Sequence, residues 1–328
     1  MALSAIILAA GKSTRMKSRR PKVLHEVCGR PMLHYVLQAC YGAGCERVMV
    51  VVGYAKDEVL AQFAEDDRIH WIEQTEQLGT GHAARMCEKE LKKVGGDVFI
   101  LAGDGPMIRT EVLRTLAQTH HQEHAAASMA TAMLDDPTGY GRIVRDAEGN
   151  FLDIVEQVDC TPEQREIREV FPSYYCVKSE ELLAAFTKLT NNNKKGEYYL
   201  TDIYGILRRA GKKVVAVQAV TQEDVLAVNS RSQLAVVDAA MQDRMQRQLM
   251  EAGVTIVSGI NTYIEAGVAV GADTVIQPFS FIGRDSSIGG DCVIGPFATL
   301  PRQSVVPDDS TVAGNISVEN ALINPVGS

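Results

Sequence analysis

Residues 4–16 read Ser4-Ala5-Ile6-Ile7-Leu8-Ala9-Ala10-Gly11-Lys12-Ser13-Thr14-Arg15-Met16, and this stretch decides the fold. Its apolar start is rich in β-branched residues, which predicts a buried strand that ends where Gly11 lets the chain turn. Backbone N–H groups of such a turn can converge on phosphate oxygens, and Lys12, Arg15 and Lys22 add three cations. The stretch therefore predicts a strand followed by a polyphosphate-binding loop. The alternative is an ordinary strand-to-helix turn with solvated basic residues.

The loop does not follow the P-loop pattern, because Ile6 stands where that pattern needs a glycine. Beyond it, apolar strand-like runs alternate with helical patterns to about residue 225. The expected strands are 47–52, 70–73, 98–102, 126–133, 153–158, 173–177 and 214–220, and the expected helices are 32–41, 81–91, 110–120 and 179–188. This alternation predicts a Rossmann-like α/β domain with a mostly parallel sheet and a ligand crevice at the carboxyl ends of the strands.

Near the C-terminus, aliphatic residues recur at every sixth position. They are Ile264, Val270, Ile276, Ile282, Ile288, Ile294, Leu300, Val306, Val312 and Val318. A small or compact residue follows most of them four positions later, as in a hexapeptide repeat whose short strands close triangular coils. We expect a nucleotidyltransferase-like domain over 1–229, a connecting helix over 230–252, and a short left-handed parallel β-helix of about three coils over 253–328.

The composition is that of a soluble chain with a sizeable core: 328 residues, 46% hydrophobic and 23% charged. The net charge of −8 argues against nucleic-acid and anionic-membrane partners. Seven scattered cysteines, an odd number without C-x-x-C spacing, indicate reduced thiols rather than a disulfide framework or a zinc site. The apolar start is too short for a signal peptide, so we expect a cytoplasmic protein.

The segment Gln74-Thr75-Glu76-Gln77-Leu78-Gly79-Thr80-Gly81-His82 leads from a predicted strand into a helix. Two amide side chains beside a glycine-rich turn can offer paired donors and acceptors to a base edge, and Thr80 adds a hydroxyl. The segment suits recognition of a pyrimidine. A polar helix N-terminus capped by Thr80 explains it equally well.

Asp104 ends an apolar strand between two glycines, in Ala102-Gly103-Asp104-Gly105. A magnesium ion held by one or two protein oxygens and by substrate phosphates needs such an exposed carboxylate. Asn229 is a candidate for the second oxygen ligand. The alternatives are a turn residue for Asp104 and a helix cap for Asn229.

Three further segments are long and specific: Asp136-Pro137-Thr138-Gly139-Tyr140-Gly141-Arg142-Ile143, Ile154-Val155-Glu156 and Asn191-Asn192-Asn193-Lys194-Lys195-Gly196-Glu197-Tyr198-Tyr199-Leu200-Thr201-Asp202. With the segments above, they resemble the bacterial N-acetylglucosamine-1-phosphate uridylyltransferases over nearly the whole chain. The usual form of that family also carries a glucosamine-1-phosphate acetyltransferase domain. The resemblance implies uridylyl transfer from UTP to an amino-sugar 1-phosphate for cell-wall precursor synthesis, with Mg²⁺ as cofactor. It also implies a homo-oligomer, a trimer through the β-helix.

The resemblance further implies a set of site residues. Catalytic roles fall to Arg15, Lys22 and Asp104, and Mg²⁺ is held by Asp104 and Asn229. Substrate contacts fall to Leu8, Ala9, Ala10, Gly11, Lys12, Gln74, Gln77, Gly79, Thr80, Ala102, Gly103, Gly141, Glu156, Phe171 and Thr201. Within this set the glutamines face the uracil, and Gly141 and Glu156 face the sugar.

The chain departs from the family pattern at the sugar. Glu169-Val170-Phe171-Pro172-Ser173 replaces the usual Asn-Thr-Gly or Asn-Ser-Gly, and Ala102 replaces a tyrosine. Phe171 either stacks on a sugar face or belongs to a repacked core, and the change leaves another hexose 1-phosphate open as substrate. The family's catalytic acetyltransferase histidine has no counterpart after His124, so we expect no acetyltransferase activity. A non-catalytic nucleotide-sugar sensor is the alternative from a different class.

Overall fold

The computed structural model describes residues 2–314, and these divide into two compact units. Unit 1 holds residues 2–25 and 32–230, and unit 2 holds residues 26–31 and 231–314. The expected first domain over 1–229 is therefore interrupted, because the short segment Glu26–Pro31 packs with the C-terminal unit. Val318, the last of the aliphatic positions of the repeat, lies outside the described residues.

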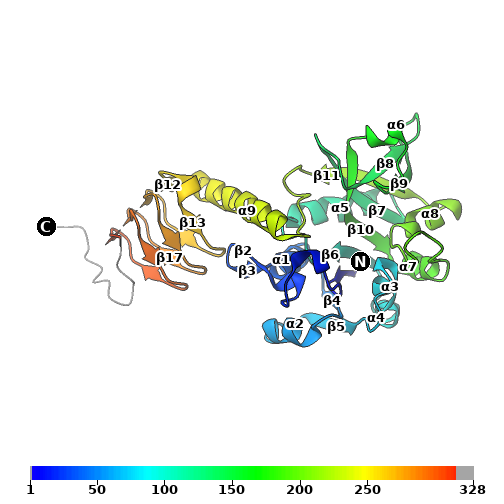
Figure 1. Cartoon of the computed structure of the whole chain (residues 1–328), viewed down its shortest axis with the longest axis horizontal. Helices are drawn as coiled ribbons and strands as arrows, with labels where there is room; N and C mark the ends of the chain where they lie inside the picture. The colour runs from blue at the N-terminus through cyan, green and yellow to red at the C-terminus, as the bar shows by residue number, and fades with distance from the viewer. Residues whose placement is uncertain (1, 315–328) are drawn as a thin grey trace. The chain divides into compact units, whose positions relative to one another are not determined.

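Unit 1 is built on a nine-stranded mixed sheet whose main order is β11-β7-β10-β6-β1-β4-β5, with β8 paired to β10 and β9 paired to β8 (Figure 1). Neighbours β5, β4, β1 and β6 are parallel, as are β7 and β11, whereas β10 runs antiparallel to β6 and β7. The strands are β1 (Leu3–Leu8), β4 (Arg47–Val52), β5 (Ile69–Glu73), β6 (Asp97–Ala102), β7 (Ala127–Met133), β8 (Gly141–Arg145), β9 (Phe151–Val155), β10 (Glu169–Lys178) and β11 (Val214–Val220). This is the expected Rossmann-like architecture.

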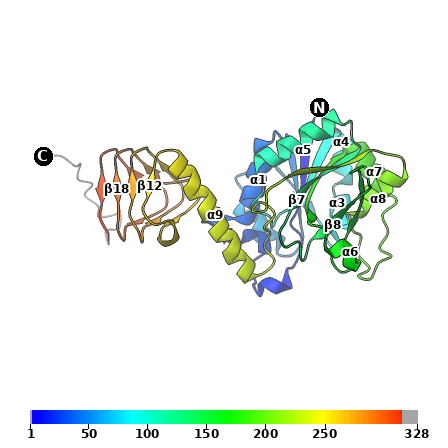
Figure 2. The same cartoon turned by 90° about the horizontal axis from the view of Figure 1, so that it is seen from above.

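Helices cover both faces of the sheet, because the strand residues alternate between two apolar cores. Ile7 and Val50 pack with α1 (Met32–Gly42) and α5 (Thr110–Gln122). Ile6 and Val51 pack with the helices of the other face, which are α3 (Thr80–Arg85), α4 (Glu88–Val94), α7 (Ser179–Phe186) and α8 (Asp202–Arg209). Figure 2 shows the two groups of helices on opposite sides of β7. The remaining helices of unit 1 are α2 (Lys56–Gln62), α6 (Pro162–Arg165), η1 (Thr14–Met16) and η2 (Lys22–Leu24).

The single helix expected over residues 81–91 is wrong, because two helices occupy this stretch. α3 ends at Arg85, and the Cys87 N–H bonds to the Ala84 carbonyl three residues back, which tightens the chain into a turn. α4 then starts afresh at Glu88. The break gives the two helices separate directions behind the sheet.

Unit 2 carries the hexapeptide repeat, and its strands form three parallel sheets. From β13 to β21 the paired strands are 18 residues apart, as Val275 and Val293 are, whereas Thr255 of β12 pairs with Val275, 20 residues further on. The strands are β12 (Thr255–Ile256), β13 (Tyr263–Ile264), β14 (Ala269–Val270), β15 (Val275–Ile276), β16 (Phe281–Ile282), β17 (Ser287–Ile288), β18 (Val293–Ile294), β19 (Thr299–Leu300), β20 (Val305–Val306) and β21 (Thr311–Val312). The aliphatic residues at every sixth position from Ile264 to Val312 point inward and are buried, except Val270, which is partly buried. The expected left-handed parallel β-helix is confirmed.

Two further elements complete unit 2. The helix α9 (Arg231–Glu251) precedes the coils, with η3 (Gly259–Asn261) in the first of them, and the hairpin β2 (Glu26–Val27) and β3 (Arg30–Pro31) joins from far upstream in the sequence. At the hairpin turn, the Cys28 carbonyl accepts from the Ala266 N–H at 2.8 Å, and the Cys28 N–H donates to Asp238 at 2.8 Å. Arg284 donates to the Gly29 carbonyl at 2.9 Å. The hairpin is thus fastened to both α9 and the coils.

Candidate active site

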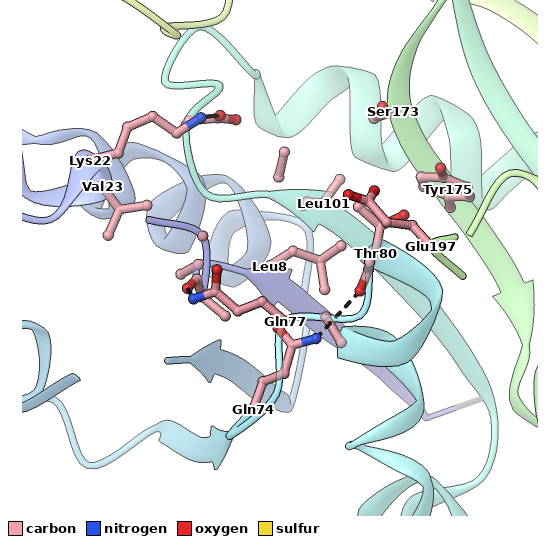
Figure 3. Close-up of a pocket in the computed structure, with 17 residues that line it drawn as sticks. Leu8, Lys22, Val23, Gln74, Gln77, Thr80, Leu101, Ser173, Tyr175 and Glu197 are labelled. Atoms are coloured by element: carbon pink, nitrogen blue, oxygen red, sulfur yellow. Dashed lines mark hydrogen bonds and ion pairs between the residues drawn. The ribbon is translucent and has the colours of Figure 1, made fainter. Parts of the chain in front are cut away.

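A cavity of about 350 Å³ lies where β1 and β6 end, at the carboxyl edge of the parallel strands. Its wall brings together most of the predicted substrate contacts (Figure 3). The lining residues are Leu8, Ala9, Ala10, Gly11, Lys22, Val23, Gln74, Gln77, Gly79, Thr80, Ala83, Leu101, Ala102, Asp104, Ser173, Tyr175 and Glu197. Parallel strands place their following loops at one edge, which explains why segments distant in sequence meet here.

The side chains of Lys22, Asp104 and Asn229 meet at one point. The Lys22 ammonium is ion-paired with the Asp104 carboxylate and donates to the Asn229 amide oxygen at 3.1 Å. Arg15 donates to the same amide oxygen at 2.9 Å. The Asp104 carboxylate and the Asn229 amide oxygen therefore both contact the Lys22 ammonium, and the Arg15 guanidinium lies beside them.

This donor set fits a magnesium ion. Carboxylate and amide oxygens are the ligands that this cation prefers, and it usually completes its shell with water and substrate phosphates. Within residues 2–314, no three His, Cys, Asp or Glu side chains are grouped so that they alone could hold a metal ion. Asp104 and Asn229 would therefore be shared with a phosphate-bearing substrate rather than form a closed protein cage.

Two glutamines form another part of the cavity wall, and hydrogen bonds to the backbone fix both. The Gln77 amide nitrogen donates to the Ala10 carbonyl at 2.8 Å, which ties the polar segment to the loop after β1. Gln74 is buried, and its amide nitrogen lies 3.3 Å from the Gly79 carbonyl and 3.0 Å from His82 Nδ1. Amides held in this way present a fixed hydrogen-bonding pattern to the cavity.

Gly79 and Thr80 fit the start of α3 closely. Gly79 has φ +109°, and a Cβ there would lie 2.6 Å from the Tyr198 carbonyl oxygen, so only glycine fits without displacement. Gly79 is also the N-cap of α3, so Thr80 is its first helical residue. The Thr80 hydroxyl oxygen accepts from the Leu200 N–H at 3.1 Å. The loop that ends at Leu200 therefore braces this part of the wall.

Several predicted residues lie away from the cavity wall. Lys12 stands over the Tyr54 ring, 5.5 Å from its centroid. Thr201 lines a second, polar cavity with Asp202. Arg15 and Asn229 belong to the cluster around Lys22 and Asp104. Gly103 lies in the sequence between the lining residues Ala102 and Asp104. Gly141 and Glu156 are close to each other, because a Cβ on Gly141 would lie 4.0 Å from Glu156 Oε1.

The expected contact between Phe171 and the substrate is corrected by the structure. Phe171 is 5% exposed and packs edge-on against Tyr175 and Tyr204, with centroid distances of 4.8 and 5.8 Å. An apolar ring at this position is better buried among other rings than left facing a polar ligand. Phe171 therefore matches the alternative of a repacked core, and the residues of this strand that line the cavity are Ser173 and Tyr175.

Three polar lining residues escaped the sequence reasoning: Ser173, Tyr175 and Glu197. Glu197 lies within one of the long specific segments, but no role was assigned to it. Ser173 and Tyr175 belong to an irregular part of β10, which the alternation of the sequence does not reveal. These three residues form the side of the cavity opposite Lys22 and Val23 in Figure 3.

The acidic groups nearby are partly withdrawn from water. Burial raises the pKa of Glu156, and it also raises the pKa of Asp202. Burial likewise raises the pKa of the Tyr175 phenol, and the Glu156 carboxylate adds to the effect. At neutral pH the phenol therefore keeps its proton and can donate a hydrogen bond.

All seven cysteines are free and buried in the structure. None of the helices within residues 2–314 combines the length and the apolar character that a membrane crossing demands.

Comparison with known proteins gives a consistent result. Residues 5–257 match the family model described as the MobA-like NTP transferase domain. Curated relatives named "Bifunctional protein GlmU" include those of Alkaliphilus metalliredigens, 45% identical over 278 residues, and Brevibacillus brevis, 44% identical over 280 residues. Each alignment covers 85% of this chain and 60% of the relative, so the chain spans less than two thirds of these proteins.

Among solved structures, this chain is similar to that of a UDP-glucose pyrophosphorylase complexed with UDP-glucose. The TM-score is 0.59 at 19% identity, and the match covers 74% of this chain and 100% of the other. At this identity the likeness shows a shared fold.

Proposed function

The chain belongs to the MobA-like NTP transferase family, and on that premise we propose that it transfers the uridylyl group of UTP to N-acetylglucosamine 1-phosphate. The observation that carries the proposal is one cavity lined by the ion pair of Lys22 and Asp104 in one part of its wall and by two fixed amides, of Gln74 and Gln77, in another. The first part suits a triphosphate and the second a pyrimidine base. The match to an NTP transferase domain supports a nucleotidyl transfer of this kind.

In the proposed reaction, a phosphate oxygen of the sugar 1-phosphate forms a bond to the α-phosphorus of UTP. The bond from the α-phosphorus to the bridging oxygen breaks, and pyrophosphate leaves with that electron pair. The sugar phosphate is already an anion, so the reaction needs little help from a general base. Lys22 and Arg15 reduce the repulsion between the two polyanions, and the cavity aligns them.

Asp104 and Asn229 would hold the magnesium ion of the proposed reaction. The bound ion would neutralise phosphate charge. Lys22, which pairs with Asp104 and Asn229 in the structure, would then pair with the substrate phosphates instead. Asp104 thus pairs with Lys22 in the structure and would bind the magnesium ion when the substrate is bound.

The direct test is release of pyrophosphate from UTP and magnesium in the presence of a panel of sugar 1-phosphates. The panel contains N-acetylglucosamine, glucosamine, N-acetylgalactosamine and glucose 1-phosphates. Fast release with N-acetylglucosamine 1-phosphate alone is the expected result. Background release with every sugar, together with tight binding of a UDP-sugar, would overturn the proposal in favour of a sensor.

A second candidate, uridylyl transfer to another hexose 1-phosphate, is favoured by one observation. Phe171 lies in the core, so position 171 offers no amide to the sugar. Preference for another sugar in the same panel would support this candidate. Acetyl transfer is not part of the proposal, and an assay with acetyl-coenzyme A would test its expected absence.

We also propose that the protein is a cytoplasmic homo-oligomer, a trimer through unit 2. Reduced cysteines support the compartment. Exposed apolar residues on the coils support the association: Phe279 and Phe297 are 55% and 56% exposed and stack with centroids 5.0 Å apart. Light scattering on the chain and on a Phe279→Ser/Phe297→Ser variant tests this, and a monomeric parent would refute it.

A further inference from the structure

Strand β10 contains an irregularity beside the cavity. Its pairing with β7 passes from Val170↔Ala132 to Tyr174↔Ala130, so four residues along β10 span only two along β7. Ser173, within this bulge, has φ +67° although it is not glycine. Bulges of this kind redirect side chains and are common next to active sites. Here the bulge directly precedes Tyr175, and both Ser173 and Tyr175 line the cavity.

The ring of Tyr175 is held rigidly. It stacks on Tyr204, with centroids 5.4 Å apart and planes 4° apart, and Phe171 packs against its edge at 4.8 Å. Tyr175 is 4% exposed, yet it contributes to the wall of the cavity. A rigid aromatic side chain at a cavity wall loses little entropy when it binds a ligand.

The polar part of this wall is small. Leu101 and Ala102 contribute apolar surface, whereas Ser173, Tyr175 and Glu197 carry the polar groups. Glu156 lies close enough to Tyr175 to affect its ionisation, and the phenol stays neutral. A neutral phenol both donates and accepts a hydrogen bond, which matches a sugar hydroxyl or an acetamido group.

We propose that the Tyr175 phenol binds the sugar portion of the substrate and determines preference among sugar 1-phosphates. This inference rests on the proposed function: if the triphosphate lies near Lys22, the sugar portion lies at the other end of the cavity, beside Tyr175. Phe171 packs against the edge of the Tyr175 ring and belongs to the core behind it. The bulge at Ser173 sets the direction in which Tyr175 points.

The first test compares Tyr175→Phe with Tyr204→Phe. The second variant is a matched control, because the Tyr204 hydroxyl donates to the Ser128 carbonyl at 3.3 Å and does not line the cavity. Loss of one neutral hydrogen bond predicts that Tyr175→Phe lowers kcat/KM for the preferred sugar 1-phosphate by about 3- to 10-fold. The KM for UTP should stay within about twofold. Equal sugar kinetics for the two variants would overturn the inference.

The second test is independent of turnover. Calorimetry measures binding of UDP-N-acetylglucosamine and of UDP to the same variants, and Tyr175→Phe should weaken only the UDP-sugar, by about 3- to 10-fold. If the parent binds the UDP-sugar but releases no pyrophosphate, the proposed function fails, and the binding comparison between the parent and Tyr175→Phe alone decides whether the phenol contacts the sugar. If Tyr175→Phe weakens UDP and the UDP-sugar equally, the phenol does not read the sugar. A parent that binds neither ligand would overturn both.

Discussion

Replacement of Phe171 by asparagine tests whether this position belongs to the core or to the substrate site. The side chain is 5% exposed and touches the rings of Tyr175 and Tyr204. Removal of a buried phenylalanine costs about 3–5 kcal/mol, and an amide left without partners adds to that cost. For a unit of roughly 200 residues, each kcal/mol lowers Tm by about 2–4 °C. We therefore expect Tm to fall by about 6–20 °C.

Differential scanning calorimetry measures this shift, with Phe171→Leu as the control. Leucine keeps an apolar side chain of similar volume and loses mainly the two ring contacts, so the expected cost is about 1–2 kcal/mol. Sugar preference, measured well below Tm, should change little in the leucine variant. If Phe171→Asn keeps the parent Tm and alters sugar preference, the residue faces substrate and the reasoning is refuted.

Three further changes test other parts of the molecule. Asp104→Asn should lower turnover about 100-fold or more while leaving metal-free binding of a UDP-sugar within a few fold, and equal losses in kinetics and calorimetry would contradict the metal role. Gly79→Ala should weaken UTP binding and lower Tm, because the new Cβ would lie 2.6 Å from the Tyr198 carbonyl oxygen; unchanged nucleotide titrations would speak against that clash. Arg302 donates two hydrogen bonds to the Glu265 carboxylate and holds the pKa of that carboxyl below its usual value. The ionised carboxylate therefore stabilises the folded protein above the unfolded pKa of about 4.3, and this stabilisation disappears as pH falls through the folded pKa. Denaturant melts should thus show Glu265→Gln about 1–2 kcal/mol less stable at pH 7 and nearly equal to the parent near pH 3, and a gap independent of pH would refute this.

The sequence predicts elements well where one physical pattern dominates. The buried strand 47–52 and the partly buried edge strand 214–220 have the expected bounds, because continuous apolar runs have few other uses in an α/β fold. The repeat is equally clear, since each inward position must be aliphatic to fill a coil. The short helix α2 was missed, because Lys56–Gln62 buries only Val59 and carries almost no periodic signal.

The candidate site was predictable only in part. The sequence places Lys22, Asp104 and Gln77 in loops of the predicted sheet, and all three line one cavity, while their roles stay predictions. Tyr175 was missed because its direction depends on the bulge in β10, which is a property of pairing between strands. A pattern within one segment contains no information about such a register shift.

The hairpin Glu26–Pro31 has a consequence for the order in which the protein is made. Its partners at Asp238, Ala266 and Arg284 are more than 200 residues downstream in the sequence. At about 5–20 residues per second, synthesis of that interval takes on the order of 10–40 s. Throughout that time Cys28 and Gly29 have left the ribosome without the groups that will bond them. Residues 32–230 of unit 1 are therefore all synthesised before the hairpin can bond to its partners in unit 2.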